Sequence, residues 1–129
     1  MNLVLTLILL GNFTITAYRS VPSQTDDSPY YTSTGEHVCK HGVAISQDLL
    51  ANNGGQLHYG DLVYIEDVGF KIVNDVMNKR HKNRMDIWVP KYEDELKFYN
   101  KFKNRKVNVW IIKGNGGVFP LLKRNIFKF

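Results

Sequence analysis

The sequence predicts a single, mainly β domain, most simply a small closed barrel with one late helix. Three observations lead to this prediction. The chain has 129 residues, 43% of them hydrophobic, which is the size and composition of one globular domain. Short runs rich in β-branched and aromatic residues recur along it, separated by turn residues. Only the segment 93–102 has the three- to four-residue apolar spacing of a helix.

The N-terminal segment allows two interpretations. Its eight-residue apolar run ends at Leu10 and is too short to span a bilayer as a helix. Residues 1–11 form either a signal remnant, without a basic start or a good cleavage site, or the first strand of a hairpin. In the second interpretation the chain turns at Gly11-Asn12 and continues as the alternating strand 13–18.

The remaining strands are predicted from composition and turn residues. Residues 19–41 hold two prolines and many Ser and Thr residues, so we expect a long surface loop. Asp67-Val-Gly69 indicates a hairpin turn, and Pro90 ends a strand because it cannot donate to a ladder. The strands predicted in this way are 43–46, 62–66, 70–74, 85–89 and 107–112.

The helix is predicted just before the last strand. Leu96, Tyr99 and Phe102 are spaced for one helical face, and the acidic residues 93–95 suit its first turn. We divide the chain into residues 1–11, a domain at 12–113 and a basic amphipathic tail at 114–129. We expect the tail to pack on the barrel, with a membrane or partner anchor as the alternative.

Cysteine and histidine give little support for a metal site. The single cysteine, Cys39, excludes intrachain disulfides and Cys-rich zinc sites. His37, Cys39 and His41 alternate in the predicted loop, which would suit a metal ion or a Cys–His pair. We favour an accidental arrangement and predict neither a metal nor an organic cofactor.

The charge is unevenly distributed along the chain. Residues 1–70 hold two basic residues against seven acidic ones, whereas residues 71–129 hold fifteen against five. The basic half suits a polyanion: nucleic acid, an acidic wall polymer or an anionic membrane. A solvated face explains it equally well. Aromatic residues that would stack on bases are Tyr64, Trp88, Tyr92 and Trp110.

Two carboxylates are the strongest candidates for chemistry. Asp75 ends one predicted strand and Asp86 lies within the next, so the two acids converge if the chain between them loops back. A partly desolvated acid beside a second carboxylate is suited to donating a proton to a leaving oxygen. Ordinary surface acids would have the same spacing. The intervening loop is basic, with Lys79, Arg80, Lys82 and Arg84.

Seven short motifs follow one another between residues 12 and 112: Thr14–Tyr18, Thr32–Gly35, Gly42–Leu50, Tyr59–Ile65, Val73–Asn78, Asn83–Trp88 and Val107–Trp110. In this order they resemble the three-aspartate (3D) domain. This is the double-psi β-barrel of membrane-bound lytic transglycosylase A and of many small bacterial and phage cell-wall proteins. The resemblance implies a six-stranded double-psi β-barrel with one helix between the last two strands.

The resemblance also implies a function. Such a domain is a lytic transglycosylase that cleaves the MurNAc–GlcNAc β-1,4 bond of peptidoglycan and leaves a 1,6-anhydro end. Asp86 matches the family's acid/base and Asp75 its second aspartate. Either Ser46 or Asp48 fills the first aspartate position, because Ser46 stands where the common pattern has aspartate. Arg84, Tyr18 and Thr34 are further substrate-binding candidates.

The partners expected from this resemblance are peptidoglycan glycan strands and anionic wall polymers. Lys79, Arg80 and Lys82 would then rim the groove. We expect neither a nucleic-acid partner nor a stable membrane span. The protein would be secreted or cell-wall associated, or part of a phage virion or lysis system. The main alternative is a non-catalytic wall-binding module, since the related barrels of expansins and rare lipoprotein A bind or loosen polysaccharide.

Overall fold

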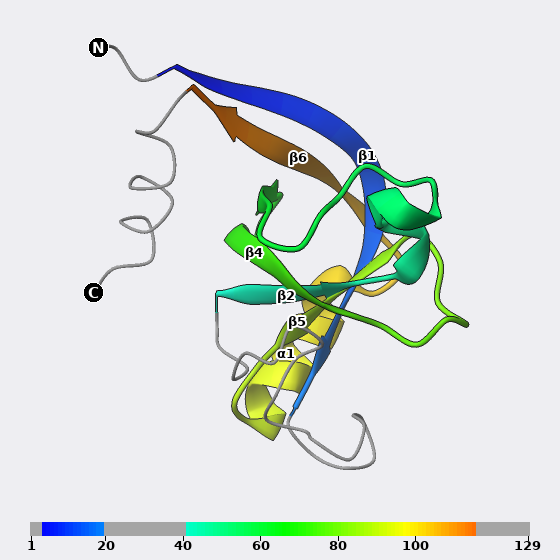
Figure 1. Cartoon of the computed structure of the whole chain (residues 1–129). Coiled ribbons are helices and arrows are strands. Elements are labelled where there is room, and N and C mark those ends of the chain that lie inside the picture. The colour runs from blue at the N-terminus through cyan, green and yellow to red at the C-terminus, as the bar shows by residue number, and fades with distance from the viewer. Residues whose placement is uncertain (1–3, 20–40, 116–129) are drawn as a thin grey trace.

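A computed structural model describes residues 4–19 and 41–115 of the chain (Figure 1). Within these residues six strands form a closed barrel, and one α-helix lies between the last two strands. The mainly β prediction is therefore confirmed. The strands are β1 (Leu5–Tyr18), β2 (Gly42–Ile45), β3 (Leu62–Ile65), β4 (Gly69–Val76), β5 (Arg84–Trp88) and β6 (Lys106–Gly114). The helix is α1 (Tyr92–Phe102), and two 3₁₀ turns are η1 (Gln47–Leu49) and η2 (Ala51–Asn53).

The barrel has the mixed topology expected of a double-psi fold. Around it the order of strands is β1-β5-β2-β4-β3-β6. Strand β2 lies between the consecutive strands β4 and β5, parallel to the first and antiparallel to the second. Strand β1 lies in the same way between β5 and β6. An earlier strand is thus inserted between two later ones twice, which brings distant parts of the chain together.

Strand alternation separates the core from the outer face of the barrel. Phe13 and Ile15 of β1 are buried, as are Met85 and Ile87 of β5. Because successive side chains in a strand point to opposite faces, the polar residues between them point outward. The core is completed by side chains from all the other strands, from α1 and from the segment before β3, including Val43, Ile45, Leu57, Val63, Ile65, Val73, Phe102, Val107, Val109 and Ile111.

Of the two interpretations of the N-terminal segment, the hairpin that turns at Gly11-Asn12 is wrong. Strand β1 continues through these residues and pairs with β6 from Leu5 to Thr14, with a bulge between Leu9 and Gly11. Gly11 adopts a φ of 143°, so its conformational freedom serves the bulge and not a turn. The residues from Leu5 to Leu9 are exposed and form a two-stranded arm with β6 beyond the barrel (Figure 1).

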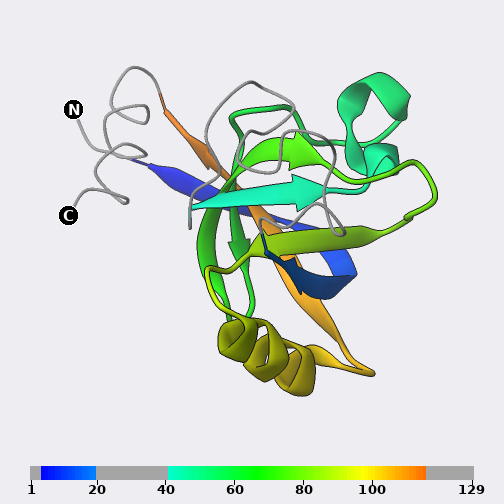
Figure 2. The same cartoon turned by 90° about the horizontal axis from the view of Figure 1, so that it is seen from below.

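The hairpin between β3 and β4 is confirmed, with Asp67 and Gly69 at positive φ in its turn. The helix is also present, but its packing differs from the prediction. Phe102 is buried and Phe98 packs beside it, whereas Leu96 and Tyr99 are exposed. Helix α1 lies outside the strands at one end of the barrel and contacts β1 (Figure 2), so only one edge of its apolar face is covered.

Several predictions fall on other parts of the chain. Nearly all of the predicted loop at 19–41 lies outside the described residues, as does the tail beyond residue 115. In the described part of the chain, no helix is both long and apolar enough to span a bilayer.

Candidate active site on the outer face of the barrel

Four residues form a row across four neighbouring strands. Thr16 of β1 pairs with Asp86 of β5, Asp86 pairs with Ala44 of β2, and Ala44 pairs with Asp75 of β4. Neighbouring strands lie about 4.8 Å apart, so the backbones at Asp75 and Asp86 are separated by roughly 10 Å. The two predicted acids therefore share one face of the sheet, with the small side chain of Ala44 between them.

Asp86 has the environment of a proton donor. Its side chain is half-buried on the outer face, and the Thr16 hydroxyl donates a hydrogen bond of 2.9 Å to its Oδ1. Burial raises the pKa of Asp86 from 3.8 to about 6, because the carboxylate loses water. The Thr16 hydrogen bond and the positive charge of Arg84 oppose this shift. The negative charges of Glu95 and Asp75 add to it.

A bulge positions Asp75 in the row. The pairing of β2 with β4 shifts between Val43 and Ala44, so Asn74 is the extra residue and Asp75 stands opposite Ala44. Asn74 is buried beside Gly42, where a Cβ would collide with its side-chain amide. Oδ1 of Asp75 accepts a hydrogen bond of 2.9 Å from the N–H of Val76, which fixes the carboxylate near its own backbone.

Ser46 and Asp48 act on the start of β5. Ser46 is completely buried, and its hydroxyl accepts a hydrogen bond of 3.0 Å from the N–H of Arg84. It has no exposed surface with which to contact a substrate. The carboxylate of Asp48 accepts a hydrogen bond of 3.1 Å from the N–H of Asn83, a residue at positive φ. Both side chains hold the backbone that leads into Asp86.

Arg84 lies beside a histidine at the end of a basic connection. Its Nη1 is 3.4 Å from Nδ1 of His81, and the pKa of His81 is lowered, first by burial and then by Arg84 and Arg80. Nε of Arg84 is buried without a hydrogen-bond partner in the described part of the chain. The predicted rim residues Lys79, Arg80 and Lys82 are exposed on this connection.

Of the other two predicted binding residues, Tyr18 lies among the described residues and Thr34 does not. Tyr18 pairs with Trp88, two residues along from the pair formed by Thr16 and Asp86, and so lies on the same outward face. Thr34 lies outside the described residues, as do His37 and Cys39. Among residues 4–19 and 41–115 there is no cluster of three potential metal ligands.

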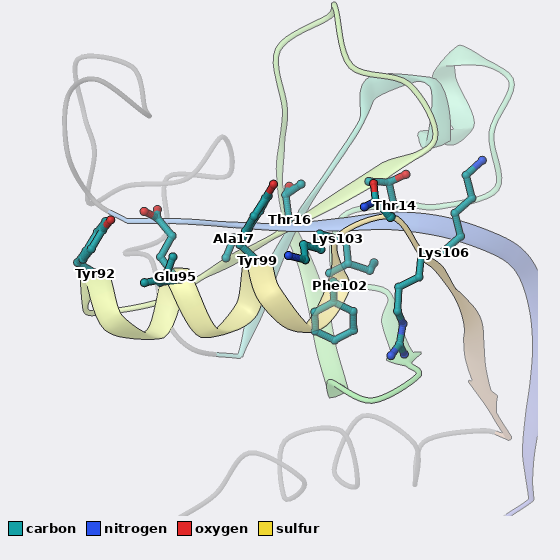
Figure 3. A pocket seen from close by; sticks show the side chains of 13 residues that line it. Thr14, Thr16, Ala17, Tyr92, Glu95, Tyr99, Phe102, Lys103 and Lys106 are labelled. Carbon is teal, nitrogen blue, oxygen red and sulfur yellow. The ribbon is translucent and has the colours of Figure 1, made fainter.

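A groove between α1 and β1 lies next to this row (Figure 3). We call it the α1–β1 groove. It has a volume of about 760 Å³. The residues that line it are Thr14, Ile15, Thr16, Ala17, Tyr92, Glu95, Leu96, Tyr99, Phe102, Lys103, Asn104, Arg105 and Lys106. Thr16 belongs both to the groove and to the row, so the groove begins beside Asp86.

Thr16 and Glu95 are the neighbours of Asp86 that sequence reasoning missed. Oε1 of Glu95 is 3.5 Å from Nε of Arg19, and its Oε2 is buried without a hydrogen-bond partner among the described residues. In the sequence Glu95 looked like one of three acids in a first helical turn. Only the position of α1 against β1 indicates that Glu95, and not Glu93, points toward the site (Figure 3).

Comparison with known proteins adds no family assignment: no family model matches the chain, and no curated protein matches it.

Proposed function

We propose that the protein is a peptidoglycan lytic transglycosylase that cleaves the MurNAc–GlcNAc β-1,4 bond with Asp86 as its single acid/base. The observation that carries the proposal is the environment of Asp86: a half-buried carboxyl on the outer face of the barrel, next to a residue that lines a groove, with its pKa raised to about 6. A carboxyl group with that pKa is half protonated at about pH 6, where an ordinary aspartate is almost fully ionised, so it can both donate a proton and take one back.

The reaction requires two proton transfers at one carboxyl group. Asp86 protonates the glycosidic oxygen as the bond from C1 of MurNAc to that oxygen breaks. The C6 hydroxyl of the same MurNAc then bonds to C1, and its proton returns to Asp86. The product carries a 1,6-anhydro ring, no water is consumed, and the enzyme is regenerated. Thr16 holds the carboxyl in place by its hydrogen bond to Oδ1.

The position of Asp75 favours this chemistry over a retaining hydrolase. A retaining glycosidase needs two carboxyl groups about 5 Å apart, one of them as nucleophile. Asp75 lies two strands away from Asp86, and its carboxylate is held by the N–H of Val76. We assign it a supporting role, through its negative charge and its place on the same face of the sheet as Asp86.

The setting that follows from this chemistry is the bacterial cell wall. The proposed partners are glycan strands, with anionic wall polymers as ligands of the exposed cations at 79–82. The protein would be secreted, wall-associated or part of a phage virion or lysis system.

The test is to incubate purified peptidoglycan with the protein and to identify the released muropeptides by mass spectrometry. We expect 1,6-anhydro ends with the wild type and none with Asp86→Asn. Glu93→Gln is the matched control, because Glu93 is an exposed carboxylate outside the groove lining, and it should act like the wild type. Reducing ends would show hydrolysis instead. Retention on the wall without release would make the protein a binding module.

A further inference from the structure

We infer that the α1–β1 groove is the glycan-binding site, in which Tyr92 and Tyr99 stack on sugar rings and Glu95 accepts hydrogen bonds from the sugar. The identity of the glycan as peptidoglycan rests on the proposed function. The groove itself is argued from its lining.

The two tyrosines are unusually exposed for large aromatic side chains. Tyr92 is 57% exposed and Tyr99 is 63% exposed, and both line the groove on one side of α1 (Figure 3). They are seven residues apart, which corresponds to about 10 Å along a helix and is comparable to the length of a disaccharide. Their electron-rich faces suit the C–H groups of sugar rings.

The groove leads to the proposed acid. Thr16 lines it and donates a hydrogen bond to Asp86. Glu95 lines it as well and lies close enough to Asp86 to interact with its charge. The Glu95 side chain is 19% exposed and lines the groove, so a ligand in the groove can reach its carboxylate. Sugar hydroxyl and acetamido N–H groups are suitable donors.

The charge distribution of the groove suits a glycan that carries acidic groups. At the Tyr92 end the carboxylate of Glu95 is paired with Arg19, whose guanidinium also lies 5.3 Å from the centroid of the Tyr92 ring, so the two charges compensate each other there. At the other end of the groove Lys103 and Lys106 provide positive charge for the carboxylates of MurNAc and its peptides (Figure 3). The groove therefore suits a mostly neutral chain that carries scattered acidic groups.

The test is calorimetric titration with a peptide-free GlcNAc–MurNAc tetrasaccharide, in an Asp86→Asn background that leaves the ligand intact. We expect Tyr92→Ala and Tyr99→Ala each to weaken binding roughly three- to tenfold. Tyr99→Phe keeps the aromatic ring and should retain most of the affinity, which would assign the effect of Tyr99→Ala to loss of the ring. Tyr59→Ala is the matched control, because Tyr59 is 44% exposed and does not line the groove. It should also bind like the parent.

Three results would overturn the inference: no binding of the tetrasaccharide, unchanged affinity in both alanine variants, or tighter binding of an oligothymidylate than of the tetrasaccharide. The proposed function fails separately. If Tyr99 supports binding but the wild type releases no anhydro ends, the groove stands and the transglycosylase does not. If anhydro ends form and the KM is unchanged in both alanine variants, the transglycosylase stands and the role of the groove in glycan binding does not.

Discussion

At the scale of single residues, the acidity of Asp86 depends on groups with opposite effects. Loss of water around the half-buried carboxyl is the largest effect and raises its pKa. Thr16 and Arg84 stabilise the ionised form, whereas Glu95 and Asp75 destabilise it. These neighbours come from separate strands and from the helix, so each can be altered without removing the carboxyl itself.

Two conservative substitutions should shift the pH dependence of glycan cleavage in opposite directions. Because the acid acts in its protonated form, activity should fall as the pH rises through the pKa of Asp86, about 6. Thr16→Val removes a hydrogen bond to the carboxylate, so the falling limb should move to higher pH. Glu95→Gln removes a negative charge near the carboxyl group, which lowers the pKa of Asp86, so the falling limb should move to lower pH. Rates of anhydro-muropeptide release from pH 4.5 to 8 measure both limbs, and shifts in the same direction would contradict this account.

The raised pKa of Asp86 should also make stability depend on pH. Between about pH 4 and 6 the unfolded chain releases this proton while the folded protein keeps it, so the folded state loses stability as the pH rises. Asp86→Asn removes the effect. The variant should exceed the wild type by at most about 3 kcal/mol at pH 8 and match it at pH 4. Urea unfolding at the two pH values measures this difference, and an equal gain at both would point to another cause.

The convergence of Asp75 and Asp86 on one face was predicted from the sequence, but their neighbours were not. The predicted resemblance to the 3D domain rests on short motifs. Such motifs give the order of residues along the chain but not which strands are neighbours. The row itself depends on which strands are neighbours, and the pairing of β1 with β5 brings Thr16 to Asp86. The complete burial of Ser46 was not predicted for a similar reason, because the contact of its hydroxyl with the Arg84 backbone follows from the β2–β5 pairing.

At the scale of elements, the entry into β5 is held by the segment after β2. Asp48, in η1, accepts a hydrogen bond from the N–H of Asn83, one residue before β5 begins. Asn83 has a φ of 51°, a conformation that few side chains tolerate without local support. This contact fixes the direction in which the strand that carries Asp86 leaves the basic connection.

We expect Asp48→Ala to destabilise the protein by about 1–3 kcal/mol, since the N–H of Asn83 loses its acceptor. Asp48→Asn keeps a side-chain oxygen and should retain most of the stability and activity. Urea unfolding together with muropeptide release measures both effects. A full loss of activity in Asp48→Asn with normal stability would instead assign the charge of Asp48 to the reaction.

The boundaries of elements were predicted well where the residues of a turn determine them. They were predicted poorly where the pairing and packing of distant segments determine them. The turn at 67–69 formed as expected because Asp67 and Gly69 accept positive φ. At Gly11 the same flexibility serves a bulge, since β6 pairs with β1 on both sides of it. The helix likewise formed, but its contact with β1 leaves Tyr99 exposed, and periodicity alone cannot indicate which edge of an apolar face is covered.

At the scale of the whole molecule, β1 serves two different environments. Its second half belongs to the barrel, where Ile15 is 4% exposed, whereas its first half forms the arm, where Leu7 is 57% exposed. Ile15→Ala should therefore cost about 2–5 kcal/mol of unfolding free energy. Leu7→Ala, on the same strand, should cost less than about 0.5 kcal/mol. Urea unfolding of the two variants measures the contrast, and similar losses would mean that the arm is part of the cooperative core.

The barrel closes between β1 and β6, which are the first and last strands of the described chain. Before β1 and β2 pair with β5, Thr16, Ala44 and Asp86 belong to separate stretches of chain, and the carboxyl group of Asp86 is exposed to water. Pairings between such distant parts of a chain are intrinsically slow to form. The raised pKa of Asp86 is therefore a property of the folded chain alone, and no short segment around Asp86 would reproduce it.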